Sequence, residues 1–188
     1  MTLLSPGTRA ILAARHFTLH ETPPRHMTIS DILHNPYGLL HDIPYSYINL
    51  RCIRYPDQII TLSRDGENWR CFATYGENGC LLLDDAGRIR ALHDDGSITP
   101  VNHNLGDFTC CLAWYQSALY AIQASGHQTG DKHFGAACER AARFARRRIA
   151  PLADTRTGSF WDDMLFYLED WLGGFNPTIN DYIQDGRA

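Results

Sequence analysis

Residues 69–122 read WRCFATYGENGCLLLDDAGRIRALHDDGSITPVNHNLGDFTCCLAWYQSALYAI, and this stretch decides the fold. Short apolar runs alternate here with three turn sequences, which are Gly76-Glu77-Asn78-Gly79, Asp84-Asp85-Ala86-Gly87 and Asp94-Asp95-Gly96. Aspartate, asparagine and glycine are typical of tight reversals, because they bond to the local backbone or accept positive φ values. The part up to Val101 therefore predicts an antiparallel β meander.

The spacing of apolar residues becomes helical after Val101. The residues that share one helical face are Phe108, Cys111, Leu112, Tyr115, Leu119 and Ile122. Asn104 is placed to cap this helix, and Asp107 suits the exposed N–H groups of its first turn. A meander and a helix can bury their apolar faces only against each other. The sequence therefore predicts an α+β fold in a single domain, residues 1–188, with the helices on one side of the sheet.

The segments on either side extend this domain. Residues 58–63 (QIITLS) predict one more strand, whereas residues 1–27 show a weak helical pattern that ends at Pro23-Pro24. A short helix is expected at residues 28–33, and residues 1–55 as a whole are interpreted as a helical or loop element. Two more amphipathic helices are predicted, at residues 132–151 and 161–172, before a loosely attached tail at residues 177–188.

Composition and charge narrow the class of protein. The chain has 188 residues, 44% hydrophobic and 20% charged, which is typical of a globular domain. It has no apolar run of about 20 residues and no signal-peptide pattern, so we expect a cytoplasmic protein without a membrane partner. The formal net charge of −4 argues against nucleic acid as a partner. Six cysteines without a CxxC pair are expected to stay reduced and mostly buried.

Several residue groups could carry chemistry, and each has a plainer structural interpretation. His16 and His20 could offer two imidazoles to zinc from one helix face, but no HExxH motif is present. Thiol catalysis would pair a cysteine with a histidine, and the candidates are Cys71, Cys80, Cys111, His93 and His103. No family signature surrounds any of them, so packing cysteines are the favoured interpretation.

The charged groups are interpreted in the same way. The aspartates occupy turns, where they are structurally expected, and no calcium-binding loop pattern is present. Arg140, Arg143 and Arg147 form a stripe that is typical of the solvated face of a helix. We therefore expect no enzyme activity, metal or cofactor.

The order of elements in the central stretch is distinctive. Residues 79–92 (GCLLLDDAGRIRAL) place an apolar strand, an acidic turn ending in glycine and a second strand in succession. Residues 98–115 (ITPVNHNLGDFTCCLAWY) then carry Asn102, Leu105 and Phe108 at the entry to the long helix. Asp154 and Phe160-Trp161 precede the last helix. This arrangement, which covers about half the chain, resembles the SUKH superfamily of bacterial immunity proteins, nearest its fourth group.

The resemblance implies an α+β fold and a cytoplasmic protein that binds and neutralises a cognate polymorphic toxin, often a nuclease or a nucleic-acid deaminase. Such a toxin presents a basic cleft, so its inhibitor gains from acidic groups and aromatic anchors. The predicted partner-binding residues are Asp65, Glu67, Trp69, Tyr75, Asp84, Asp85, His93, Asp94 and Asp95. Trp69 could equally belong to the core. Two alternatives stay open: an adaptor or scaffold with a different partner, and a small enzyme with Cys/His or carboxylate chemistry.

Overall fold

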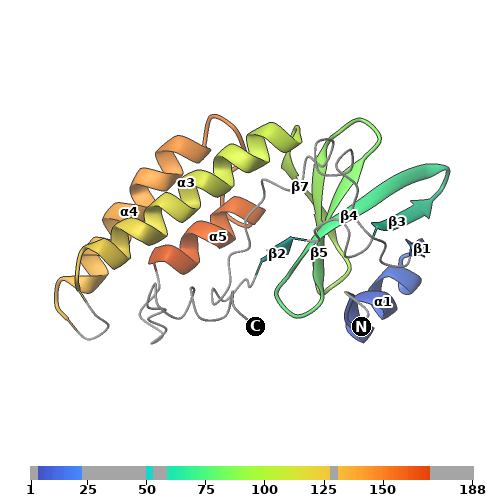
Figure 1. Ribbon diagram of the computed structural model, residues 1–188, viewed down its shortest axis with the longest axis horizontal. Coiled ribbons are helices and arrows are strands. Elements are labelled where there is room, and N and C mark those ends of the chain that lie inside the picture. The colour runs from blue at the N-terminus through green and yellow to red at the C-terminus, as the bar shows by residue number, and fades with distance from the viewer. Residues whose placement is uncertain (1–3, 23–49, 53–58, 128–130, 170–188) are drawn as a thin grey trace, which may run out of the picture.

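The computed structural model describes residues 4–22, 50–52, 59–127 and 131–169, whose elements are labelled in Figure 1. The helices are α1 (Pro6–Ala14), α3 (Leu105–Ala124), α4 (Phe134–Ile149) and α5 (Phe160–Glu169). The strands are β1 (Thr18–Thr22), β2 (Arg51–Cys52), β3 (Ile59–Arg64), β4 (Glu67–Tyr75), β5 (Gly79–Asp84), β6 (Ile89–Leu92) and β7 (Ile98–Asn102). They form one antiparallel sheet in the order β1-β3-β4-β5-β6-β7, with β2 paired to β4. The predicted α+β fold is confirmed.

The predicted meander is formed by β3 to β7, which follow one another in the sequence and in the sheet. Two of its turns need glycine, because Gly87 has a φ of 80° and Gly96 a φ of 77°. In the second of these turns the Gly96 N–H donates to the carbonyl oxygen of His93 at 2.8 Å. The turns set the register of the strands, so that Leu83 pairs with Ile89.

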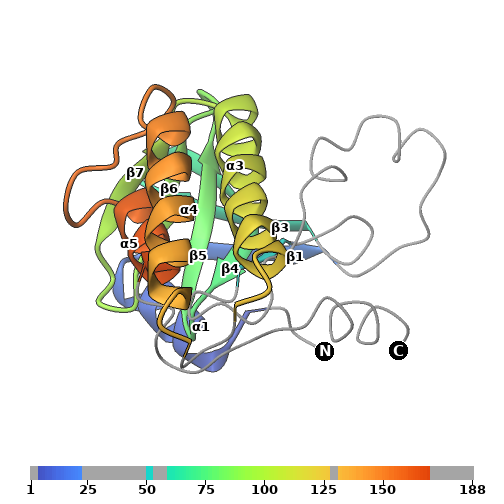
Figure 2. The ribbon, with the colours of Figure 1, turned by 90° about the vertical axis from the view of Figure 1, so that its left-hand side faces the viewer.

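Three helices, α3, α4 and α5, cover one face of the sheet (Figures 1 and 2). Helix α3 is capped as predicted, since Asn104 Oδ1 accepts a hydrogen bond from the Asp107 N–H at 2.8 Å. Its predicted inner residues Phe108 and Tyr115 are fully buried. The strand residues that meet these helices include Phe72, Leu81, Ile89 and Val101. This layer forms the larger of the two cores.

A single buried amide, that of Asn102 at the end of β7, ties this layer together. Its Nδ2 donates to the carbonyl oxygen of Leu152 at 3.1 Å, and its Oδ1 accepts from Trp161 Nε1 at 2.9 Å. Nδ2 also lies 3.6 Å from the Cys111 sulfur. Asn102 therefore joins β7 to α3, to the loop after α4 and to α5.

The opposite face of the sheet is also covered, which corrects the expectation that the helices lie on one side only. Helix α1 lies across the sheet from α3, α4 and α5 (Figure 1) and contributes Leu12 to a second core. The strand residues in this second core include Ile60, Leu62, Trp69, Cys71, Cys80, Leu82 and Leu92. Because neither face of β5 meets water, this strand reads GCLLLD with apolar residues at successive positions.

The prediction of a helical or loop element at the N-terminus is wrong in part. Helix α1 ends at Ala14, and His16 reverses the chain with a φ of 61°. Residues 18–22 then form β1, which pairs with β3 and places Leu19 opposite Leu62. The predictions for residues 28–33, for the end of the last helix near Leu172 and for the tail at residues 177–188 lie outside the described residues.

Helix α1 is fixed to the turn between β4 and β5 through Asn78. Ser5 Oγ donates to Asn78 Oδ1 at 2.8 Å, and Thr8 Oγ1 donates to the Asn78 carbonyl oxygen at 2.9 Å. Gly7 approaches the same side chain so closely that a Cβ at this position would overlap Asn78 Oδ1. The helix is thereby locked in register on the sheet.

A β-bulge in β4 lets one strand serve both cores. Cys71 pairs with Leu82 and Ala73 pairs with Leu81, which leaves Phe72 as the extra residue. Cys71 belongs to the core beneath α1, whereas Phe72 belongs to the core beneath α3. The Phe72 ring meets Phe108 edge-on, with the ring centroids 5.6 Å apart.

Candidate functional site

The sheet divides the predicted partner-binding residues between its two opposite ends. The β3–β4 and β5–β6 turns lie at one end, called the Asp85 end, with Asp65, Glu67, Asp84 and Asp85. The β4–β5 and β6–β7 turns lie at the other, called the Asp94 end, with Tyr75, His93, Asp94 and Asp95. A strand of six residues separates the ends by about 17–20 Å. This exceeds the Debye length of about 8 Å, so the two groups of charges act largely independently.

At the Asp85 end, Asp84 closes the turn between β5 and β6. Its carboxylate accepts hydrogen bonds from the backbone N–H and the Nε of Arg88, both at 2.8 Å, and the residue is only 9% exposed. Burial alone would raise the pKa of Asp84, but the Arg88 hydrogen bonds and charge outweigh it and the pKa is lowered. Asp84 therefore offers little to a partner, whereas its neighbour Asp85 is exposed.

At the Asp94 end, an exposed acidic turn is held by hydrogen bonds. Asp95 Oδ1 accepts from the Ser97 N–H at 2.8 Å, and Asp94 Oδ1 accepts from the Asn78 N–H at 3.2 Å. Arg15 Nη2 donates to the carbonyl oxygen of Asp95 at 3.1 Å. The hydrogen bonds from Ser97 lower the pKa of Asp95, so this carboxylate is ionised at neutral pH.

Behind this turn, the side chains of Tyr75 and Thr99 fix the position of His93. The Tyr75 hydroxyl donates to the Leu92 carbonyl oxygen at 2.9 Å and lies 3.1 Å from His93 Nδ1. Since a carbonyl can only accept, the tyrosine oxygen is left to accept from His93 Nδ1–H. His93 Nε2, which lies 2.7 Å from Thr99 Oγ1, can then accept the threonine proton. Sequence reasoning missed Thr99, because a threonine in a strand indicates only β propensity.

The same network is anchored to the helical layer. The Phe160 ring at the start of α5 meets Tyr75 edge-on at a centroid distance of 5.5 Å. Burial raises the pKa of Tyr75, so its hydroxyl stays protonated and keeps its role as a donor. Tyr75 and His93 therefore form a rigid base for the acidic turn.

Trp69 belongs to the core, the alternative that the sequence left open. It is 5% exposed and packs edge-on against Phe17 at a centroid distance of 6.4 Å. The Arg90 guanidinium lies 5.8 Å from the centre of the Trp69 ring. The side chain stabilises the layer between α1 and the sheet and is not a surface anchor.

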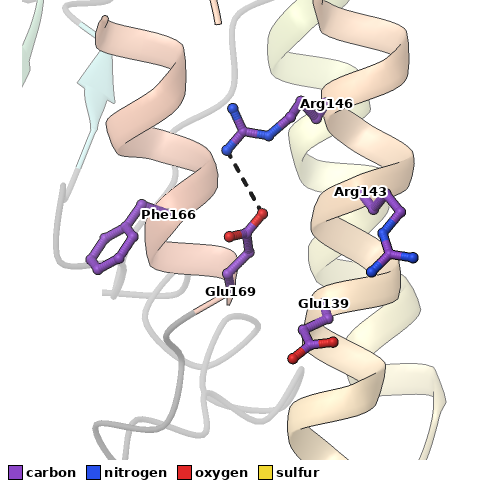
Figure 3. A pocket seen from close by; sticks show the side chains of 5 residues that line it. All are labelled: Glu139, Arg143, Arg146, Phe166 and Glu169. Atoms are coloured by element: carbon purple, nitrogen blue, oxygen red, sulfur yellow. Dashed lines mark ion pairs between the residues drawn. The ribbon is translucent and has the colours of Figure 1, made fainter. Parts of the chain in front are cut away.

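A groove of about 550 Å³ lies between α4 and α5, and sequence reasoning did not find it. Its lining residues, drawn in Figure 3, are Glu139, Arg143, Arg146, Phe166 and Glu169. Arg146 Nη1 donates to Asp162 Oδ1 at 2.7 Å, and Nη2 lies 3.7 Å from Glu169. Through these ion pairs Arg146 links α4 to α5, so its role is structural. A lining with charges of both signs and so few apolar contacts is unlike a small-molecule pocket.

The geometry of the described residues gives little support to a metal-binding site or to a catalytic cysteine. Within the described ranges, no three His, Cys, Asp or Glu side chains are grouped as a metal ion would require. His16 follows the end of α1 and His20 lies in β1, so the two imidazoles do not share a helix face. Among the cysteines whose side chains the structure describes, Cys71, Cys80, Cys110, Cys111 and Cys138 are free, and of these only Cys110 is exposed. Burial raises the pKa of Cys111 to about 11, which keeps its thiol protonated and unreactive.

Among the helices in the described part of the chain, none has the length and apolar character to cross a bilayer. Comparisons with protein families, with curated proteins and with solved structures find no match to this chain.

Proposed function

We propose that this chain is a non-catalytic protein that binds a cognate toxin domain in the cytoplasm and neutralises it by covering its active or substrate site. The resemblance of residues 79–115 to the SUKH immunity proteins supports this function. The Asp94 end is the surface that we assign to the toxin. A toxin that acts on nucleic acid has a basic cleft, to which a negatively charged turn is complementary.

The observation that carries the proposal is the way in which the acidic turn is held. Asp94 and Asp95 are exposed, yet Asn78, Ser97 and Arg15 fix the turn from three directions. A loop that is ordered before binding loses little conformational entropy when it binds. It therefore presents its carboxylates to a partner at a low entropic cost, as a tight inhibitor requires.

Removal of the two charges tests the proposal. Asp94→Asn with Asp95→Asn keeps side-chain oxygens as acceptors for Asn78 and Ser97, so the turn should stay folded. Association with a toxin domain encoded by a neighbouring gene should slow by about tenfold at low salt, because steering is lost. In about 1 M salt, where charges are screened beyond about 3 Å, the variant and the wild type should associate at similar rates. Stopped-flow mixing at several salt concentrations measures both effects.

A matched control comes from the opposite end of the sheet. Glu67→Gln with Asp85→Asn removes the same amount of charge from exposed positions and should leave association unchanged. If this control pair slows association and the Asp94 pair does not, the Asp85 end is the binding surface. If the chain neither binds the encoded toxin domain nor protects cells that express it, the proposed function is wrong.

A further inference from the structure

The outer surface of α3 and α4 combines a nearly uncharged helix with a row of arginines. The two helices run side by side in front of the sheet in Figure 2. Helix α3 reads LGDFTCCLAWYQSALYAIQA, in which Asp107 is the sole charged residue. Its exposed positions are Gly106, Cys110, Ala113, Ser117, Tyr120, Ala121 and Ala124. An ordinary surface helix carries charges on its outer face, and a helix without them is usually covered.

Two hydroxyl groups of α3 bond to the backbone of their own helix. Ser117 Oγ donates to the carbonyl oxygen of Ala113 at 2.8 Å, and Thr109 Oγ1 donates to that of Leu105 at 2.8 Å. Tyr120, in contrast, is 55% exposed. The outer face of α3 therefore offers a smooth, uncharged strip with one projecting aromatic ring.

Helix α4 borders this strip with positive charge. Arg140, Arg143, Arg147 and Arg148 are all exposed, and within the described residues none of them forms a salt bridge. They lie within about 12 Å along the helix axis, at 1.5 Å per residue. The helix dipole accounts for basic residues in the last turn, but it does not account for Arg140 and Arg143.

An aromatic cluster joins the two helices at this surface. Trp114 of α3 and Phe144 of α4 meet edge-on at a centroid distance of 5.8 Å, and Phe144 is 45% exposed. The Arg148 guanidinium lies 5.1 Å from the Trp114 ring and 5.5 Å from the Phe144 ring. Stacking on the rings holds the guanidinium plane while its N–H edges stay available to a carboxylate. Tryptophan and arginine are the residue types that dominate protein interfaces.

We propose that this surface is a second binding site, for a protein segment with an apolar ridge bordered by carboxylates. The α3–α4 surface comprises Trp114, Tyr120, Phe144, Arg140, Arg147 and Arg148, whereas Arg143 lines the groove between α4 and α5. The ridge packs on α3 and against Trp114, and the carboxylates pair with the arginines of α4. The site is opposite in charge to the Asp94 end, so it binds a different partner and does not depend on the proposed function.

Charge favours this protein segment over two other possible partners, a second copy of the chain and a nucleic acid. A second copy of the chain would bring the arginines of two α4 helices together, and α3 and α4 contain only Asp107 and Glu139 as acidic residues. A nucleic acid longer than this basic patch, which spans about 12 Å, would be repelled by the rest of a chain whose net charge is −4. A carboxylate-bearing protein segment meets neither form of repulsion.

The test uses a display library of 18-residue helical peptides against the full-length chain. Each peptide carries a fixed leucine stripe, and the positions beside the stripe are Glu, Gln or Lys in equal proportion. Selected peptides should be enriched in Glu over Lys at these positions by at least about tenfold, the ratio that corresponds to about 1.4 kcal/mol. Enrichment of Lys, or no enrichment, would overturn the proposal.

Variants of the chain locate the peptide. The double variant Arg140→Gln/Arg147→Gln should bind a selected Glu peptide at least about tenfold more weakly than the wild type. The single variant Phe144→Ala should show a loss of affinity of the same size. All three positions are exposed, so circular dichroism should show an unchanged fold. The control pair Arg51→Gln with Lys132→Gln removes the same charge elsewhere and should leave the affinity unchanged.

Two further measurements separate the other occupants. If a 12-nucleotide single strand binds more tightly than the Glu peptide and loses affinity in the Arg140/Arg147 variant, the surface is a nucleic-acid site and the proposal is wrong. Light scattering of the chain alone should give a monomer mass. A dimer that dissociates on Tyr120→Glu would assign the surface to self-association instead.

Discussion

Asn102→Leu should destabilise the protein more than its small change in volume suggests. The leucine cannot replace the amide, so the buried Trp161 Nε1–H loses its acceptor and the Leu152 carbonyl oxygen loses its donor. A buried polar group without a partner costs about 1–3 kcal/mol. The Leu152 carbonyl is partly accessible to water and recovers some of this loss. We therefore expect the free energy of unfolding to fall by about 2–4 kcal/mol, a large share of the roughly 5–15 kcal/mol of a typical domain.

Urea unfolding followed by tryptophan fluorescence measures this change, and a double-mutant cycle assigns it. In a Trp161→Phe background the indole N–H is already absent. Asn102→Leu should then cost at least about 1 kcal/mol less than it does in the wild type. An equal cost in both backgrounds, or a loss below about 0.5 kcal/mol in the wild type, would refute the role given to this amide.

Three other predictions concern buried groups. Leu112→Ala should lower the free energy of unfolding by about 2–5 kcal/mol in a urea titration, because it leaves a cavity beneath α3. Asp84→Asn should lower the free energy of unfolding by about 1–2 kcal/mol at pH 7. Because the pKa of Asp84 is lowered in the folded state, the difference between variant and wild type should shrink in acid titrations as the pH falls below about 4. A thiol reagent at pH 8 should label Cys110 in the native protein well before Cys111, as mass spectrometry can show, and equal rates would contradict the burial of Cys111.

Local chemistry made much of the fold predictable. Asp-Gly and Asn-Gly patterns place turns through interactions within a few residues, so the meander from β3 to β7 could be inferred without any tertiary contact. Asn104 was predictable as a helix cap for the same reason, since its partner Asp107 is three residues away. Turns and helix caps depend on residues only a few positions apart, so the local sequence is enough to predict them.

The second layer was not predicted, because it depends on contacts between distant residues. The weak helical spacing of residues 11–17 crosses the true end of α1, and the reversal at His16 carries no glycine to mark it. Strand β1 is recognisable only through its pairing with β3. One local signal of the second layer was present in the sequence. The run Cys80 to Leu83 has too many successive apolar residues for a strand with one solvent-exposed face.

The candidate site was predicted by residue type but not by arrangement. Alternate turns of a meander lie at opposite ends of a sheet, so Asp85 and Asp94 could have been separated from the order of elements alone. Burial of Asp84 could also have been suspected, because the first aspartate of a turn commonly accepts backbone N–H groups. The cluster of Trp114, Phe144 and Arg148 needed the packing of two helices, which the sequence does not give.

The attachment of α1 to Asn78 has a consequence for the order in which the chain assembles during synthesis. Ser5 and Thr8 bond to a residue 73 and 70 positions later in the chain. At about 5–20 residues per second, roughly 4–14 s pass between translation of the helix and translation of its partner. Leu4, Leu12 and Phe17, all buried in the finished protein, have no sheet to cover them during this time. The hairpins of β3 to β7, in contrast, join neighbours in the sequence and close quickly. Helix α1 therefore waits for its sheet after it is translated, and these three apolar side chains are what a chaperone would meet on the nascent chain.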